Sequence, residues 1–496
     1  MKKISFDNAK YIRMQSEHIL ERIKKFDNKL YLEFGGKLFD DAHASRVLPG
    51  FKPDSKLEML LQLKEQSEII IVISACDIEA NKVRGDSEIS YDGEVLRLID
   101  AYTQIGLYVG SVIISQFENQ QGAIKFREYL NDRGIKNFVS YKIPGYPNDI
   151  PYILSDEGFG KNEFIETERP LVIVTAPGPG SGKLSTCLSQ MYHEQKRGVR
   201  AGYAKFETFP IWNLPLKHPV NVAYEAATAD LNDVNMIDPF HLEAYNITTV
   251  NYNRDVEAFP VLKAMFEKIM GCCPYKSPTD MGVNMVGNCI IDDEAASEAS
   301  KQEVIRRYFN ALCENKAGNI GIEVVNKIEF LMTQLGIKVE DRRVVVAARE
   351  KAAQGYESTF AIELPNGDLV TGRRSELLGA PAACMLNALK ALANINDEIP
   401  LISPQIIEPI TKLKTEILHG RNPRLHLDEV LIALTMSATT NPVSHLALTQ
   451  IKKLEQCEAH STLILDPIDK NILRKLGINF TSSPKFKTKS LYRSQI

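Results

Sequence analysis

The sequence predicts an α/β protein with parallel sheets, followed by a more helical α+β region. Short apolar runs such as residues 67–75 (SEIIIVISA) alternate with amphipathic runs such as residues 95–106 (VLRLIDAYTQIG). Strands that are apolar throughout and alternate with helices are typical of parallel sheets covered by helices on both faces. A length of 496 residues corresponds to about three domains.

Residues 1–165 are expected to form a first, Rossmann-like α/β domain. A polar, helix-forming segment opens the chain, and residues 28–41 alternate like a strand that turns at Gly35-Gly36. The domain lacks the GxGxxG fingerprint of dinucleotide-binding folds. Periodicity predicts helices at residues 56–66, 95–106 and 123–134, and strands at residues 67–75, 108–117 and 135–143.

Residues 166–330 are expected to form a second, P-loop-like α/β domain that binds phosphate. A connector rich in proline and glycine, residues 144–170, separates it from the first domain. The expected order is a strand at residues 171–176, a glycine loop, a helix at residues 183–198 and a strand at residues 199–206. Polar loops and helices then run to about residue 330.

Residues 331–496 are expected to form an α+β C-terminal domain with several helices. Residues 342–350 and 359–374 have strand-like patterns, the latter as a hairpin that turns at Asn366-Gly367. The apolar helices between residues 376 and 455 indicate a homo-oligomer. The sequence predicts helices at residues 379–395, 403–418 and 426–454, and a strand–helix–strand unit at residues 461–481.

The composition and charge of the chain indicate which classes of binding partner to expect. A net charge of -4 gives no electrostatic case for nucleic acid or an anionic membrane surface. The N-terminus has no unbroken apolar run typical of a signal peptide, and the strongest apolar run, residues 69–75, is far shorter than a membrane span. Eight cysteines lie at scattered positions without a CxxC motif. We therefore expect a cytoplasmic protein with reduced thiols and a small-molecule substrate.

The segment from Leu171 to Met191, LVIVTAPGPGSGKLSTCLSQM, is typical of a phosphate-binding loop between a strand and a helix. Glycines let successive N–H groups face an anion, the helix N-terminus adds its dipole, and a lysine adds a charge. The full pattern is GxxxxGK[ST], but Pro177 replaces the first glycine and Leu184 replaces the hydroxyl residue. The candidate cofactor-binding residues are Gly178, Gly180, Ser181, Gly182, Lys183, Ser185 and Thr186.

A second lysine follows in the same unit. The strand after the loop and helix ends in Lys205. Residues 171–209 thus resemble the dethiobiotin-synthetase-like branch of P-loop proteins, and this resemblance implies that Lys205 also faces the phosphates. Lys183 and Lys205 are the candidate catalytic residues. The alternative is a glycine-rich turn with Lys183 in solvent.

Candidate metal ligands lie further along the chain. In a helix, Asp230 and Asp233 would share one face, and together with Ser185 or Thr186 they would hold Mg²⁺. The alternative for this region is a capped, solvent-facing helix start at Asp238-Pro239.

Five residues are candidates for contact with the substrate. Lys37, His43 and Arg46 follow a Gly-Gly turn and would meet an anionic substrate at the mouth of the parallel sheet. A plain hairpin is the alternative there. Asp280 and Asn284 lie in a polar loop, SPTDMGVN, for which helix capping is the alternative.

Several long blocks together resemble one known family. They are EFGGKLFDDAHASRVLPGF, GYPNDIPYILSDEGFGKNEFIET, APGPGSGKLSTCLSQMYHE, SPTDMGVN and NPRLHLDEVLIALTMSATTNP. They resemble an uncharacterised bacterial protein family, number 0371, with domain of unknown function 1846, along essentially the whole chain. The resemblance implies a bacterial, cytoplasmic, oligomeric protein. It implies no activity, so no catalytic residue follows from it.

Three functions remain open at this stage. The first is an ATP-dependent metabolic enzyme, a transferase or ligase, that acts with Mg²⁺ on a small anionic substrate. The second is an enzyme in which the glycine loop binds a substrate or dinucleotide phosphate without phosphoryl transfer. The third is a non-catalytic, nucleotide-responsive oligomer.

Overall fold

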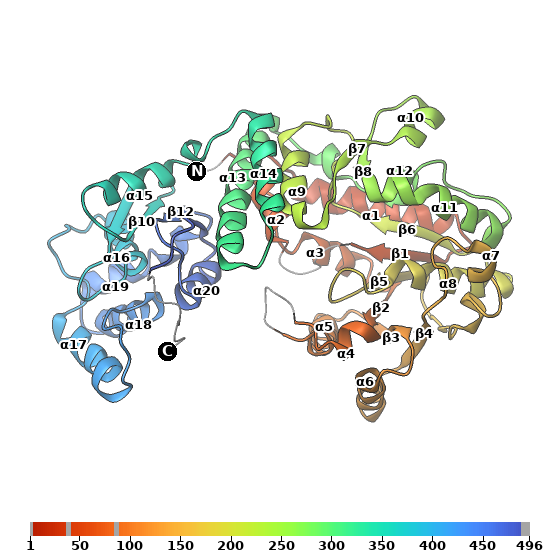
Figure 1. Ribbon diagram of the computed structural model, residues 1–496, viewed down its shortest axis with the longest axis horizontal. Coiled ribbons are helices and arrows are strands. Elements are labelled where there is room, and N and C mark those ends of the chain that lie inside the picture. Colours follow the sequence, from red (N-terminus) through yellow and green to blue (C-terminus); the bar gives the residue numbers. More distant parts are fainter. Residues whose placement is uncertain (1–2, 36–40, 84–88, 488–496) are drawn as a thin grey trace. The chain divides into compact units, whose positions relative to one another are not determined.

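The computed structural model describes residues 3–35, 41–83 and 89–487 (Figure 1). The chain divides into two compact units. Of the described residues, the sheet unit comprises those within 4–225 and 233–297, and the C-terminal unit comprises residue 3, residues 226–232 and residues 298–487. Among the described residues, none of the helices has the length and apolar character needed to cross a membrane.

The sheet unit is built on one seven-stranded sheet in which every pair of neighbours is parallel. The strand order is β4-β3-β2-β5-β1-β6-β9, and Figure 1 shows β1 running between β5 and β6. The strands are β1 (Leu30–Phe34), β2 (Ser67–Ser74), β3 (Val109–Phe117), β4 (Asn137–Tyr141), β5 (Leu171–Thr175), β6 (Gly202–Phe206) and β9 (Gly282–Val283).

This single sheet corrects the expected division into two parallel-sheet domains, although the α/β class itself is confirmed. The expected boundary at residues 165 and 166 falls between two strands of the same sheet, because β1 pairs with β5 on one edge and with β6 on the other. The reason is that periodicity identifies strands but carries no information about which apolar strands become neighbours.

Helices cover both faces of the sheet. Tyr31 donates to Glu194 of α8 (3.0 Å), so α8 lies on the face to which β1 directs Tyr31 and Glu33. Phe34 and Phe206 stack on the opposite face, where Lys56 of α3 lies over the Phe206 ring. The helices of this unit are α1 (Asn8–Lys24), α2 (Ala42–Val47), α3 (Ser55–Gln62), α4 (Ala75–Glu79), α5 (Tyr91–Gln104), α6 (Gln121–Asp132), α7 (Ile150–Ile153), α8 (Lys183–Lys196), α10 (Pro239–Tyr245), α11 (Asn253–Met270) and α12 (Pro278–Met281).

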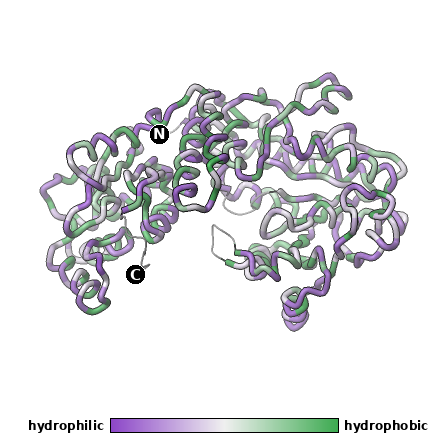
Figure 2. Tube along the Cα trace, in the orientation of Figure 1, coloured by the Kyte–Doolittle hydropathy of each residue, from purple (hydrophilic) through white to green (hydrophobic). Residues whose placement is uncertain are grey.

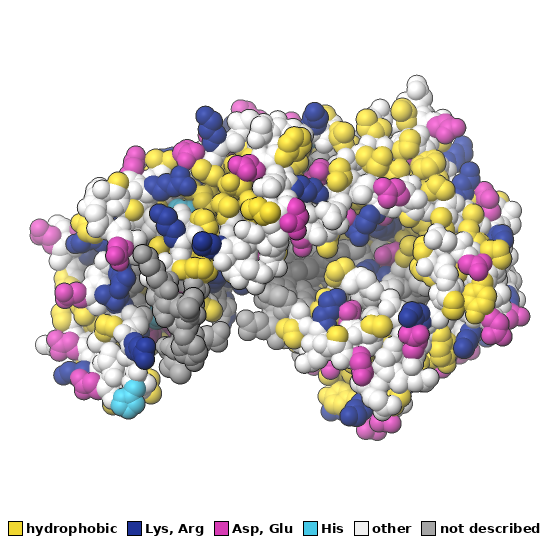
Figure 3. Space-filling model, in the orientation of Figure 1, with side chains coloured by type: hydrophobic (Ala, Val, Ile, Leu, Met, Phe, Trp, Pro, Cys, Tyr) yellow, Lys and Arg dark blue, Asp and Glu magenta, His cyan; other side chains and the backbone are white. Residues whose placement is uncertain are grey.

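A small antiparallel pair, β7 (Asn235–Ile237) and β8 (Val250–Tyr252), completes the sheet unit. Two helices, α9 (Pro219–Ala227) and α13 (Asp293–Ala317), run across the division between the units. Along the helices, hydrophobic and hydrophilic residues alternate at short intervals (Figure 2), as expected for helices with one buried face. Figure 3 shows basic and acidic side chains interspersed over the face it draws.

The C-terminal unit contains a mixed four-stranded sheet in the order β11-β10-β12-β13. Its strands are β10 (Thr359–Glu363), β11 (Leu369–Arg373), β12 (Glu458–Ser461) and β13 (Asn479–Ser482). The hairpin predicted at Asn366-Gly367 is confirmed, since β10 and β11 pair antiparallel. The helices are α14 (Ile322–Leu335), α15 (Arg343–Ala353), α16 (Ala380–Ala393), α17 (Pro404–Lys412), α18 (Leu427–Ala438), α19 (Pro442–Leu448) and α20 (Pro467–Lys475).

The strand predicted at residues 342–350 is wrong, because this segment forms most of α15. Its consecutive valines favour a strand by intrinsic propensity. However, Val344 and Ala348 are buried with Ala361 of β10 in one small cluster. The spacing of four residues between them is that of one helix face, so tertiary packing outweighs the local preference.

A buried arginine joins the two parallel strands of the C-terminal sheet. Arg342 is 1% exposed, and its guanidinium donates to the carbonyls of Ala459 (3.1 Å) and Asn479 (2.7 Å). It also donates to the hydroxyl of Thr481 (3.2 Å) and to Glu458 (2.6 Å). One planar side chain thereby binds both β12 and β13.

We predict that Arg342→Ala destabilises this sheet by about 2–4 kcal/mol, because it removes four hydrogen bonds of a buried guanidinium, although Glu458 keeps its ion pair with Arg306 (2.8 Å). Hydrogen exchange of peptides covering β12 and β13 should accelerate. The matched control is the neighbouring Arg343→Ala, because Arg343 is 57% exposed and pairs with Glu363 at the surface. Equal exchange rates in the two variants would show that the network around Arg342 does not hold the strands.

Candidate functional site

The strand order gives the sheet two topological switch points at the carboxyl ends of its strands, called here the first crevice (between β2 and β5) and the second crevice (between β1 and β6). From β2 the chain continues to β3 on one side, whereas from β5 it continues to β6 on the other side. The connections from β1 and β6 also diverge, towards β2 and β9 respectively. Such switch points are where open α/β sheets bind ligands. The glycine loop follows β5 directly, so it borders the first crevice.

At each glycine of the loop, a residue with a side chain would be unfavourable for a physical reason. Gly180 and Gly182 have φ values of 76° and 88°, which L-residues with side chains rarely adopt. A Cβ atom at Gly178 would lie 2.3 Å from the hydroxyl of Tyr91, so a larger residue there would displace the Tyr91 side chain. Gly182 is the N-cap residue of α8. The loop is therefore a specific backbone structure.

The N-terminus of α8 has no side-chain cap among the described residues. The N–H of Thr186 donates to the Gly182 carbonyl (2.9 Å). The N–H groups ahead of Thr186 in the first turn have no partner within the helix. Lys183 is the first residue of α8 and is half-buried. These features together provide oriented N–H groups, a helix dipole and a positive charge.

Hydroxyl groups support the loop from inside. The Ser181 hydroxyl donates to the Gly178 carbonyl (2.8 Å), and Ser115 at the end of β3 donates to the Ser181 carbonyl (2.6 Å). Ser181 thus holds the loop in shape. Ser185 is half-buried in the first turn of α8, and Thr186 is 2% exposed. The Thr186 hydroxyl has no hydrogen-bond partner among the described residues.

A cluster of charges occupies the carboxyl ends of β1 and β6, at the second crevice. Lys205, 23% exposed, forms ion pairs with Asp255 of α11 and with Glu207, where Nζ lies 2.8 Å from Oε1. Glu33 stands beside Lys205 in the sheet register and accepts a hydrogen bond from Tyr203 (2.7 Å). The charge on Lys205 is therefore already compensated by carboxylates.

The environment of this cluster changes how its members titrate. Burial alone would lower the pKa of Lys205, but Asp255, Glu207 and Glu33 outweigh it, so the pKa is raised and the amine stays charged. Burial raises the pKa of Glu207 to about 7 despite the opposing effect of Lys205. The Oε1 atom of Glu207 accepts no aligned hydrogen bond within the described chain. Glu207 therefore keeps its proton to a higher pH than an ordinary glutamate does, because burial disfavours its charged form.

Two of the candidate substrate residues lie in α2, after β1. His43 contacts Phe209 and Tyr224 edge-on, with ring centroids 5.2 and 5.5 Å away, and Arg46 is half-buried. Lys37 lies outside the described residues.

The other two candidates make contacts that stabilise loops. Asn284 is buried and donates to the carbonyls of Thr208 (3.3 Å) and Pro210 (3.0 Å), so it holds the chain that follows β6. Asp280 of α12 accepts a hydrogen bond from Tyr245 (2.8 Å).

The structure does not gather the candidate metal ligands into one described cluster. Asp230 is exposed and belongs to the C-terminal unit, whereas Asp233 belongs to the sheet unit. Asp233 is buried and pairs with Arg254 of α11 (2.6 Å), and burial raises its pKa. Asp238 accepts a hydrogen bond from the His241 N–H (3.0 Å) as the N-cap of α10, so capping explains that aspartate.

Sequence reasoning missed Glu33, Glu207 and Asp255. The sequence did contain a usable signal. Glu33 is the last residue but one of an otherwise apolar strand (LYLEF), and Glu207 directly follows the strand GYAKF. Charged residues at the carboxyl ends of parallel strands point to a site. Asp255, at the start of α11, carries no such signal.

A cavity of about 660 Å³ lies at the opposite end of the strands. Lys29, Gln66 and Pro170 in its wall immediately precede β1, β2 and β5. This location is away from both crevices, so the cavity does not contribute to the candidate site.

Comparison with known proteins identifies the family. The family model described as "Domain of unknown function DUF1846, N-terminal" matches residues 4–336. The model of the C-terminal domain of the same family matches residues 340–492. UPF0371 proteins of Streptococcus pneumoniae serotype 19F (strain G54) and serotype 2 (strain D39 / NCTC 7466) are each 58% identical over 493 residues. These alignments cover 99% of this chain and 100% of the relatives. The chain therefore belongs to the uncharacterised bacterial family UPF0371, with its N- and C-terminal DUF1846 domains.

Proposed function

We propose that this protein is an enzyme that binds a phosphate-bearing ligand, ATP in the first instance, at the loop between β5 and α8. The observation that carries this proposal is the uncapped N-terminus of α8, reached through a glycine loop at a switch point of the sheet. Phosphate groups are the ligands that such an N-terminus binds best. The free thiols of all eight cysteines support the proposal of a cytoplasmic location.

The two lysines have different roles in this proposal. Lys183 has neither an ion pair nor a hydrogen bond within the described chain, so its charge is available to a phosphate. Lys205 is held between Asp255 and Glu207. It therefore acts on a ligand only together with those carboxylates, and its main effect is on their protonation.

The charged side chains at the second crevice favour one kind of substrate group at that position. Glu33, Glu207 and Asp255 surround one lysine, so a neutral or hydrogen-bond-donating group is favoured over an anion at that point. We propose that Glu207 accepts or donates a proton there, since its pKa near 7 suits both directions. The anionic part of the substrate belongs at the glycine loop or near Arg46.

A second candidate function is phosphate binding without phosphoryl transfer. Leu184 occupies the position at which P-loops place the hydroxyl that binds Mg²⁺. The side chains of Ser185 and Thr186 offer hydroxyl groups only one and two positions later, in the first turn of α8. In this reading, the loop holds a phosphate of the substrate or of a dinucleotide.

A third candidate is a nucleotide-responsive oligomer, and a surface of α18 favours it. Ile432 and Met436 are 60% and 59% exposed on the same side of that helix. Large exposed apolar neighbours are typical of interaction surfaces, and the proposed partner is a second copy of the chain.

The phosphate site is tested by Lys183→Ala. We expect ADP and ATP to bind about 10- to 100-fold more weakly in calorimetry, the range for a hydrogen bond to a charged group. The matched control is Lys196→Ala at the other end of α8, where the lysine is 51% exposed and pairs with Asp156. Affinities within twofold of the wild type in Lys183→Ala would reject the loop as the phosphate site.

Phosphoryl transfer is tested separately. If the first candidate is right, the wild-type protein releases ADP from ATP in the presence of Mg²⁺, and release stops without Mg²⁺ and in Lys183→Ala. If the second is right, NAD(P) or sugar phosphates raise the melting temperature, whereas ATP has no effect. A change in sedimentation with nucleotide, without ADP release, would favour the third.

The titration of Glu207 predicts how stability depends on pH. Because its folded-state pKa of about 7 exceeds the ordinary 4.5, the folded protein binds more protons than the unfolded chain between these values. Stability is therefore lost as pH rises through that window, by on the order of 3 kcal/mol. Glu207→Gln should remove this loss, so its advantage over the wild type in urea unfolding should grow from pH 5 to pH 8.5. Glu65→Gln, at a side chain that is 82% exposed, is the control that should show no such trend.

A further inference from the structure

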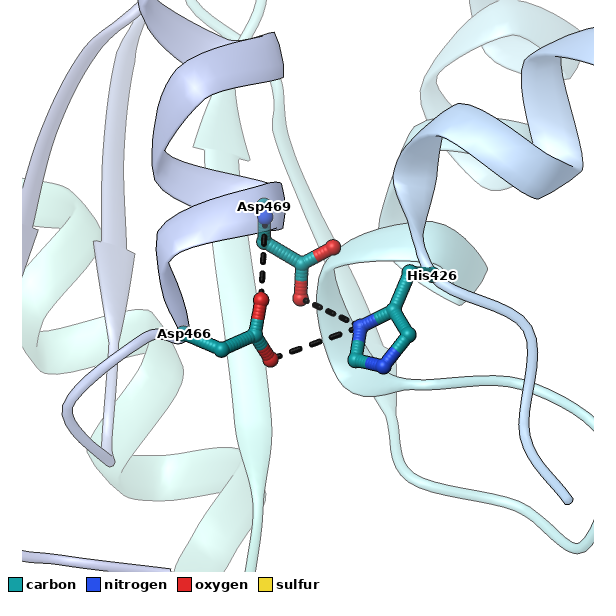
Figure 4. Close-up of side chains that lie close together, drawn as sticks. All are labelled: His426, Asp466 and Asp469. Carbon is teal, nitrogen blue, oxygen red and sulfur yellow. Dashed lines mark hydrogen bonds and ion pairs between the residues drawn. The ribbon is translucent and has the colours of Figure 1, made fainter. Parts of the chain in front are cut away.

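Three metal-ligating side chains of the C-terminal unit face one another (Figure 4). His426 is the N-cap residue of α18, Asp466 is the N-cap residue of α20, and Asp469 lies in the first turn of α20. One ligand atom from each lies within 4.8 Å of the others. The cluster belongs to the C-terminal unit, whereas the glycine loop belongs to the sheet unit.

The spacing is longer than that of hydrogen bonds and suits a shared cation. Nδ1 of His426 lies 3.4 Å from Oδ2 of Asp466 and 3.6 Å from Oδ2 of Asp469. Hydrogen bonds between nitrogen and oxygen are shorter, about 2.7–3.2 Å. Two ligands bound at about 2.1 Å to one ion, at octahedral or tetrahedral angles, lie about 3.0–3.4 Å apart. A small inward shift would place all three ligands on a single metal ion.

The two carboxylates are held so that one oxygen of each remains for a ligand. Oδ1 of Asp466 accepts the Asp469 N–H (3.0 Å), and Oδ1 of Asp469 accepts the Leu427 N–H (3.0 Å). The Asp469 side chain is 3% exposed, and its Oδ2 lies 3.6 Å from Nδ1 of His426. Figure 4 shows this oxygen directed at the imidazole.

A cation already approaches this place. The ammonium of Lys487 lies 2.6 Å from Oδ2 of Asp466, the same atom that faces the imidazole, and the lysine is 43% exposed. An exposed lysine is a weak and replaceable partner. A divalent ion would compete with it for the same oxygen.

We propose that His426, Asp466 and Asp469 bind a divalent first-row metal ion such as Zn²⁺ or Mn²⁺. Imidazole favours these ions over Mg²⁺ and Ca²⁺, and carboxylates complete the set. Metal binding at Nδ1 places the imidazole proton on Nε2, the nitrogen on the far side of the ring from the two carboxylates. The ion joins the N-termini of α18 and α20, and three protein ligands leave room for water.

Equilibrium dialysis of the full-length protein against Zn²⁺, with metal analysis, tests the proposal. We expect one equivalent per chain, and at least tenfold weaker binding in His426→Ala and in Asp469→Asn. The matched control is His445→Ala, because His445 is an exposed histidine on the neighbouring α19. No binding by the wild type, or equal losses in His426→Ala and His445→Ala, would overturn the proposal.

Chemical modification of the wild-type protein tests the same proposal without these variants, so it applies even if they do not fold. Zn²⁺ should protect His426 from diethyl pyrocarbonate, read by peptide mass spectrometry, and leave His445 reactive. Lys487→Ala should tighten Zn²⁺ binding about two- to fivefold, because it removes a competing ammonium whose surface ion pair is worth that much. Unprotected His426 would mean that a protonated imidazole between two carboxylates accounts for the cluster.

Discussion

The pairing of β1 with both β5 and β6 is the constraint on which the rest of the sheet unit depends. Leu30 stands opposite Leu171 on one edge and opposite Gly202 on the other. The second register needs a glycine, because a Cβ atom at position 202 would lie 2.1 Å from the ring of Phe26. Once β1 is fixed there, the chain must leave β5 and β6 towards one side and β1 and β2 towards the other. The two crevices follow from this arrangement.

The same arrangement explains why local structure was predictable from the sequence and the sheet was not. The strand before the glycine loop, the helix after it and the next strand, which carries Lys205, are all present as expected. The neighbours of each strand depend on contacts between residues far apart in the chain, such as Tyr31 with Glu194. Periodicity carries no record of those contacts, so one sheet was divided into two. The valines of α15 show the same limit, because a contact with β10 decides their conformation.

The candidate site was predictable to a similar extent. Gly178, Gly180, Gly182 and Lys183 lie together in one loop because they are close in sequence. The partners of Lys205 come from a strand end and from α11, and only the folded chain brings them together. These partners change the interpretation of Lys205 from a free charge for phosphate to a lysine that stabilises buried carboxylates. In the proposed function, the positive charge for a phosphate therefore comes from Lys183, and Glu207 is the residue proposed to exchange a proton.

The cluster in the C-terminal unit includes a histidine, His426, at the N-cap position of α18, where histidine is an unusual residue type. Ser, Thr, Asp and Asn are the side chains that best cap a helix, and Asp466 caps α20 in this way. His426 makes no side-chain cap at α18. Instead, Glu429 accepts the His426 N–H (2.8 Å), so the imidazole is not needed to satisfy that helix end. It faces Asp466 and Asp469, which follow His426 by about 40 residues in the chain. The divalent ion that we propose would bind the imidazole and compensate the charge of the same two carboxylates.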